Sequence, residues 1–101
     1  MSILSKRIRE ARRLAGISQE RLAIEIGIDP ASASARMNRY EQGTRVPDPT
    51  IVERIASELG LPMAYFYAAN DDEAKLLQWF CRLGEEEKAE LMQRVELEMR
   101  N

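Results

Sequence analysis

Apolar residues recur at three- and four-residue intervals near the start of the chain. This spacing places their side chains on one face of an α-helix. We therefore predict an amphipathic helix over residues 2–15, ended by Gly16. The apolar residues at these intervals are Leu4, Ile8, Ala11 and Ala15.

The next segment, from Ser18 to Gly43, has the pattern of two short helices joined by a turn. Ser18 is a typical N-cap residue, and Ile17 and Leu22 on either side of it are spaced to form a hydrophobic staple. Gly27 is placed to end the first of the two helices. Two helices that cross such a turn form a helix-turn-helix.

The second helix of this pair is predicted to begin at Pro30. Asp29 before it is a capping residue, and proline favours the first helical position. Ala33, Met37 and Tyr40 then share a face that can pack inward. The other side carries hydroxyl, amide and guanidinium groups, which contact the phosphates and base edges of nucleic acids. These outward residues are Ser32, Ser34, Arg36, Asn38 and Arg39.

Two more helices complete the first two-thirds of the chain. Asp48 and Pro49 repeat the start signal of a helix that Gly60 ends. Pro62 opens a short last helix, in which Phe66 should close the core. The apolar stripe of the longer helix consists of Ile51, Ile55, Ala56 and Leu59.

The chain is predicted to be all-α, with a five-helix domain over residues 1–69 and a helical pair over residues 70–101. The pair has an apolar face that is too wide for solvated helices. It either folds back on its own domain or is buried against a second subunit. We favour a homodimer, because DNA-reading domains of this size bind paired half-sites about 34–36 Å apart. The candidate dimerisation residues are Leu76, Trp79, Phe80, Leu83, Leu91, Met92 and Val95.

The charge is unevenly distributed. The formal net charge is −2, but residues 1–47 carry +4, from nine Lys or Arg and five Asp or Glu. Residues 48–101 carry −6, from six basic and twelve acidic residues. Affinity for phosphates depends on local charge, so the basic half favours nucleic acid as the partner and the acidic half should face away from it.

The composition argues against several other classes of protein. The chain contains no histidine and only one cysteine, Cys81, which argues against a disulfide or a zinc site. There is no glycine loop for phosphates and no cluster of metal ligands, so we expect neither an enzyme nor a cofactor. No apolar run approaches 18 residues and no signal-peptide pattern is present, so we expect a cytoplasmic protein without a membrane partner.

Three motifs in order carry a resemblance to a known family. The strings are SQERLA at 18–23, MNRYEQG at 37–43 and VPD at 46–48. Together with their flanks, they resemble the helix-turn-helix domain of Cro and lambda-type phage repressors, the xenobiotic-response-element family. The resemblance covers about residues 4–67 and implies a sequence-specific DNA-binding regulator, with repression as the expected outcome. Between Gly27 and the YEQG segment, the chain carries about four residues more than the shortest members of the family. These extra residues lengthen either the start of the second helix or the loop before it.

The outward side of the second helix is the candidate base-reading surface. From the residues alone, two interpretations of Arg36 and Arg39 stay open. They are solvated or phosphate-contacting charges, or at least one of them reaches a guanine through the major groove, a contact worth about 1–3 kcal/mol of discrimination. The resemblance places Ser34, Ala35 and Arg39 at positions that face bases. Asn38 lies beside them, with an amide suited to adenine or to a phosphate.

Two groups of residues are candidates for contacts with DNA phosphates. Ser18 and Gln19 stand at a helix N-terminus, where N–H groups and the helix dipole attract phosphate, although Ser18 can simply cap the helix and Gln19 can be solvated. The resemblance, in which this glutamine meets the DNA backbone, favours the contact. Gln42, Thr44 and Arg45 resemble the family's second phosphate clamp, and the alternative is a solvated loop.

The resemblance also assigns a structural ion pair. Arg12 and Glu41 occupy the positions of a partly buried pair that fixes the first helix against the second helix of the helix-turn-helix. Removing one partner of a fully buried pair costs roughly 3–5 kcal/mol. For the remaining basic side chains of the first helix, a solvated basic face is the simplest interpretation, and a specific role stays open for each of them: Lys6, Arg7, Arg9 and Arg13.

Two alternative functions remain open from the sequence. The chain can be an antitoxin or accessory module whose C-terminal helices bind another protein, or an interaction protein that keeps the fold without affinity for DNA. The 34 residues after Tyr67 are too few for a separate ligand domain, so we expect no small-molecule effector.

Overall fold

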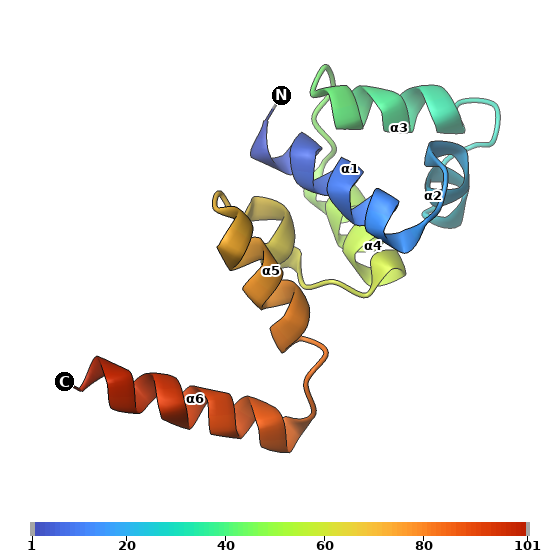
Figure 1. Ribbon diagram of the computed structural model, residues 1–101. Helices are drawn as coiled ribbons and strands as arrows, with labels where there is room; N and C mark the ends of the chain where they lie inside the picture. The colour runs from blue at the N-terminus through green and yellow to red at the C-terminus, as the bar shows by residue number, and fades with distance from the viewer. Residues whose placement is uncertain (1, 101) are drawn as a thin grey trace.

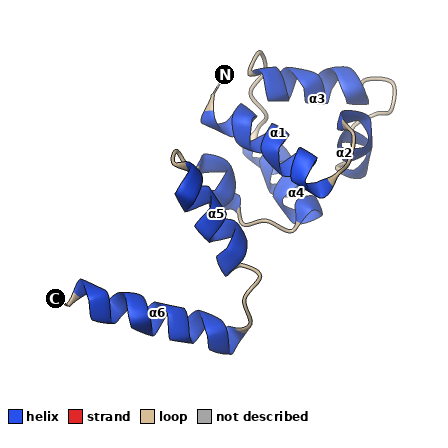
Figure 2. Cartoon of the chain, viewed as in Figure 1, coloured by secondary structure: helices blue, strands red, loops and turns tan. Residues whose placement is uncertain are grey.

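The protein, described here by a computed structural model that covers residues 2–100, is built from helices in this range and shows no strand there (Figures 1 and 2). Six are α-helices and one is a 3-10 helix, η1. In chain order they are α1 (Ile3–Ala15), α2 (Gln19–Glu25), α3 (Ala33–Gln42), α4 (Pro49–Leu59), η1 (Met63–Tyr67), α5 (Asp71–Phe80) and α6 (Glu85–Met99).

Local capping sets most of the helix ends. The Ser18 hydroxyl accepts a hydrogen bond from the Arg21 N–H at 3.0 Å, and the Asp48 carboxylate accepts one from the Ile51 N–H at 3.0 Å. Gly16 ends α1 in the left-handed conformation, with φ of 70°, which glycine adopts without steric cost. The predicted starts of α2 and α4 and the predicted end of α1 are therefore confirmed.

The second helix of the helix-turn-helix, α3, was predicted to begin at Pro30. This start is wrong, because α3 begins at Ala33. The Asp29 carboxylate accepts from the Ala31 N–H at 3.0 Å, and the Asp29 carbonyl accepts from the Ser32 N–H at 2.9 Å. An aspartate followed by proline closes a turn with these bonds as readily as it caps a helix. The extra residues before Ala33 therefore lengthen the connection from α2 to α3, and they do not lengthen α3 itself.

The hydrophobic core lies between α1, α2, α3, α4 and η1. Met37 is fully buried and Tyr40 is 2% exposed, so the inward side of α3 is anchored as its periodicity predicts. Phe66 on η1 closes the core, as expected, although this short helix is 3-10 and not α. The other fully buried large apolar side chains include Ile8, Leu22, Val52 and Ile55.

The last two helices differ in how they relate to this core. Ala74 on α5 is 1% exposed, and Leu77 packs against the core from the same helix. Helix α6 has no buried residue and extends away from the rest of the molecule (Figure 1). The architecture is a lambda-repressor-like five-helix domain, α1 to η1, followed by two C-terminal helices.

Tyr65 is buried in the core with its hydroxyl lacking a hydrogen-bond partner among residues 2–100. Its ring packs edge-on against Phe66, with centroids 5.2 Å apart. Burial of the hydroxyl, with the negative charge of Glu10 close by, raises the pKa of Tyr65 from 10.0 to about 12. The folded protein therefore resists ionisation of this side chain.

We expect Tyr65→Phe to leave the melting temperature at neutral pH unchanged or higher, because the variant loses no hydrogen bond and removes a buried hydroxyl that has no partner. The two proteins should diverge above pH 10. The unfolded tyrosine ionises there first, so stability that is complete below pH 10 is lost as the pH rises through the folded pKa of about 12. Urea denaturation from pH 8 to pH 12 measures this difference. Parallel stability curves for the two proteins would contradict the prediction.

Candidate nucleic-acid interface

A buried ion pair holds α3 against α1. Glu41 is fully buried, and its two carboxylate oxygens accept from Nε and Nη2 of Arg12 at 2.6 and 3.0 Å. Nη1 of Arg12 donates to the Ile17 carbonyl at 2.9 Å. One arginine thus joins α1, the connection to α2 and the far half of α3. The structure brings together the two residues that the family resemblance pairs.

Two further side chains surround the Glu41 carboxylate. Nε2 of Gln19 donates to Oε1 of Glu41 at 3.1 Å, and Nε of Arg9 lies 3.6 Å from the same oxygen. A buried charge is tolerated only when it is paired and its remaining lone pairs are hydrogen-bonded. The helical period of α1 gives no signal of the position of Arg9 beside Glu41, because a solvated residue has the same local pattern.

The opposite side of α3 is exposed and polar. At about 100° per residue, Ala35, Asn38 and Arg39 lie on the side away from Met37. Ser34 stands at the edge of this stripe. We call the set the α3 outer face; it consists of the exposed residues Ser34, Ala35, Asn38, Arg39 and Gln42.

The two arginines of α3 differ in their surroundings. Arg36 is partly buried at the flank of α3. Its Nε donates to the Tyr40 hydroxyl at 2.9 Å, and its guanidinium carbon lies 5.9 Å from the centroid of the Tyr40 ring. Arg39 is exposed, and its side chain has no hydrogen-bond partner within the described part of the chain. Arg39 is therefore the less restrained of the two candidates for a base contact.

Asn38 is oriented by α2. Its Oδ1 accepts from Nε2 of Gln19 at 3.2 Å, so its NH₂ group is left to face outward. A bidentate contact with adenine uses both the oxygen and the NH₂ group of an asparagine. In this arrangement the Asn38 NH₂ group is free to donate, one lone pair of its Oδ1 is occupied by Gln19, and Gln19 acts as a bridge between α2 and the outer face.

The other candidate phosphate contacts flank α3. Ser18 caps α2, so its hydroxyl already accepts from the backbone. After α3 ends, the Thr44 N–H and hydroxyl both donate to the Arg39 carbonyl, at 3.1 and 3.4 Å, and the Arg45 N–H donates to it at 3.3 Å. Gln42, the last residue of α3, and Thr44 and Arg45 just after the helix are all exposed.

Neither a cluster of metal-ligating side chains nor a membrane-spanning helix is found in the described part of the chain. No group of three or more His, Cys, Asp or Glu side chains is placed to hold a metal ion in residues 2–100. None of the helices in the same range is long and apolar enough to cross a membrane.

The fold and the exposed polar face of α3 define a helix-turn-helix protein. A family model described as Helix-turn-helix matches residues 8–66, more than half of the chain. The chain therefore belongs to the Cro- and lambda-repressor-like helix-turn-helix family of DNA-binding transcriptional regulators. The crystal structure of transcriptional regulator BswR is similar over 92% of both chains, with a TM-score of 0.88 and 40% sequence identity. No curated protein sequence gives a significant match.

Arg12→Ala should lower the free energy of unfolding by about 3 kcal/mol, because the buried Glu41 loses its bidentate partner. The value lies at the low end for such pairs because Gln19 and Arg9 still contact the carboxylate. Chemical denaturation measures the change. Arg13→Ala, at an exposed position one residue along α1, is the control and should change stability by less than about 0.5 kcal/mol.

The double variant Arg12→Met with Glu41→Leu tests why Arg12→Ala is destabilising. The loss can come from the unpaired charge of Glu41 or from the packing that the Arg12 side chain provides. Apolar side chains of similar volume often replace a buried ion pair at little cost. We expect this double variant to be more stable than Arg12→Ala alone. A double variant as unstable as the single one would contradict the stranded-charge account.

Proposed function

We propose that the protein is a sequence-specific transcriptional repressor that binds DNA as a homodimer, with α3 in the major groove. The observation that carries the proposal is the two-sided character of α3. Its inner side is fixed by the buried Met37, Tyr40 and Glu41, and its outer face is polar and exposed. The major groove of B-DNA admits an α-helix and presents a distinct donor and acceptor pattern for each base pair.

The geometry supports a different DNA contact for each residue of the α3 outer face. Arg39 is the candidate for a bidentate contact with guanine, and the Ala35 methyl suits contact with a thymine methyl. Asn38 donates to a base or phosphate through its NH₂ group, and Ser34 lies at the edge of the same surface. Arg36, anchored through Nε to Tyr40, reaches DNA only through its two terminal nitrogens.

Phosphate contacts are proposed on both sides of α3. Ser18 and Gln19 lie at the start of α2. Gln42 is the last residue of α3, and Thr44 and Arg45 follow the helix. Because the two groups flank the outer face, they suit the role of fixing α3 in the groove while the bases are read between them. The net charge of +4 on residues 1–47 supports an attraction to the duplex despite the total of −2.

The exposed apolar face of α5 and α6 supports a homodimer. Trp79 is 58% exposed and Met92 is 56% exposed, although such large side chains are normally covered. A hollow of about 330 Å³ lies between the two helices and has a wholly apolar lining. Its lining residues are Leu76, Leu77, Phe80, Leu91, Met92 and Val95. With Trp79 and Leu83 beside them, these residues form the proposed dimer face.

A second copy would contact this face through apolar side chains and not through charge pairs. Helix α6 is acidic, and Arg100 after its end is already paired with Glu96 at 2.8 Å. The charged residues of the helix are Glu85, Glu86, Glu87, Glu90, Glu96 and Glu98 against Lys88 and Arg94. An antitoxin-like module that uses the same face for a different protein is the second candidate, because no residue of α6 is buried within its own chain.

Arg39→Ala and Arg45→Ala should weaken DNA binding in different ways. Arg39→Ala should relax the preference at one base pair by about 1–3 kcal/mol, because it removes a base contact. Arg45→Ala should weaken all sequences equally and reduce the salt slope of log K by about 1, because it removes a phosphate contact. Operators selected from random duplex DNA, titrated by fluorescence anisotropy at several salt concentrations, measure both effects. Equal losses on specific and random DNA for both variants would refute these roles.

Val95→Glu should convert the dimer to a monomer, because it places a charge in the apolar face. Leu97→Glu is the matched control: Leu97 is 55% exposed against 46% for Val95, but it does not line the hollow. Analytical ultracentrifugation should show a monomer for the first variant and a dimer for the second and for the wild type. A monomeric wild type that purifies with a different protein at fixed stoichiometry would favour the antitoxin-like module instead.

A further inference from the structure

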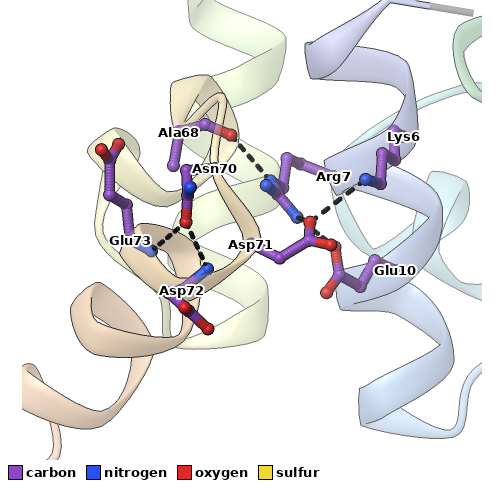
Figure 3. Close-up of polar contacts among 8 residues, drawn as sticks. All are labelled: Lys6, Arg7, Glu10, Ala68, Asn70, Asp71, Asp72 and Glu73. Atoms are coloured by element: carbon purple, nitrogen blue, oxygen red, sulfur yellow. Dashed lines mark hydrogen bonds and ion pairs between the residues drawn. The ribbon is translucent and has the colours of Figure 1, made fainter.

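Arg7 is a buried cation at the junction between the domain and α5. The sequence leaves a solvated position open for this residue, but it is only 1% exposed. Its Nε donates to the Ala68 carbonyl at 3.0 Å, and its Nη1 donates to Glu10 at 2.7 Å and to Asp71 at 3.0 Å (Figure 3). Lys6 adds a second cation 3.1 Å from the same Asp71 oxygen. We call this set of contacts the Arg7 cluster.

The Arg7 cluster fixes where α5 begins. Ala68 follows the last residue of η1, and Asp71 is the first residue of α5. Between them, Asn70 caps α5 by accepting from the Asp72 and Glu73 N–H groups at 2.7 and 3.3 Å (Figure 3). The hydrogen bonds from Lys6 and Arg7 hold the pKa of Asp71 below its ordinary value, so this anchor stays charged at neutral pH.

The second half of α5 is held by apolar contact and not by ion pairs. Leu77 packs partly buried against the core, and Ala74 is the only buried residue of α5. A hollow of about 200 Å³, lined by Leu14, Leu61 and Gln78 among others, lies between the end of α1, the residues that follow α4 and the last turn of α5. The direction of α5 therefore depends on Ala74, on Leu77 and on the Arg7 cluster at its start.

A small change in this direction is amplified along the helix. At about 1.5 Å per residue, the 10 residues of α5 span about 15 Å, so a swing of about 10° around Asp71 moves the far end by about 2.6 Å. One base pair of B-DNA rises by about 3.4 Å. A swing of 10–15° thus moves the far end of α5 by a distance comparable to the rise of one base pair.

We propose that Arg7 and Asp71 set the direction of α5, and through it the spacing between operator half-sites that the dimer accepts. The inference rests on the proposed function, because it requires DNA binding by two copies joined through α5 and α6. Neither residue touches DNA in this scheme. Both are positioning residues, which act by holding the two recognition helices at one separation.

The test is a spacing series built on an operator selected by the wild-type protein from random duplex DNA. The centre of the operator is lengthened and shortened by one and two base pairs, and Kd is measured for each duplex. Wild type should bind its best spacing at least about tenfold more tightly than a spacing changed by one base pair, because a rigid dimer fits one separation. Asp71→Ala should reduce this ratio to about threefold or less, because α5 can then swing.

Asp72→Ala is the matched control. It also removes one acidic side chain from the first turn of α5, but the Asp72 carboxylate has no ion-pair partner within residues 2–100. We expect it to keep the wild-type spacing ratio. Affinity for a single half-site and the sedimentation of the dimer should be the same for all three proteins, which separates a change of direction from loss of folding or of dimerisation.

The outcomes distinguish the inference from the function on which it rests. If Asp71→Ala keeps the wild-type spacing ratio, or if Asp72→Ala loses it equally, the positioning role is overturned while DNA binding by a dimer stands. If the wild type binds no duplex or sediments as a monomer, the proposed function itself fails and the inference falls with it.

Discussion

The burial of one carboxylate underlies the whole arrangement of the domain. Glu41 has no exposed surface, and Arg12, Gln19 and the more distant Arg9 supply the positive charge and hydrogen bonds that make this burial tolerable. These partners come from α1 and from the start of α2, so the charge is satisfied only when both helices are in place around α3. The polar contact therefore determines how the three helices are placed, while the apolar core supplies the driving force for folding.

The same contact links stability to recognition. Gln19 uses one NH₂ group for both Glu41 and Asn38, so the network that satisfies the buried charge also orients a side chain of the outer face. Arg36 is tied to Tyr40, another residue of the inner side. Arg39, in contrast, is left to reach outward. Pre-organised polar groups lose less conformational freedom on binding, which favours a rigid α3 for reading bases.

The junction to the C-terminal helices repeats this design with different residues. Arg7 is buried and paired, and it holds the start of α5 through Ala68 and Asp71. In both places an arginine of α1 reaches a different part of the chain, toward α3 in one case and toward α5 in the other. Helix α1 is therefore the element against which both the proposed DNA-contacting helix and the proposed dimer-forming helices are oriented.

Periodicity and capping residues by themselves determined the helices, most of their ends and the inward side of α3, because these depend on neighbours within a few positions. Asp29 and Pro30 show the limit: the pair is compatible with a helix start or a turn, and the bonds of Asp29 to Ala31 and Ser32 select the turn. Only the tertiary structure decided which arginines of α1 are solvated, since the positions of Arg7, Arg9 and Arg12 depend on Asp71 and Glu41, which are distant in the sequence. A charged residue on a helix has the same local pattern whether water or a buried carboxylate faces it.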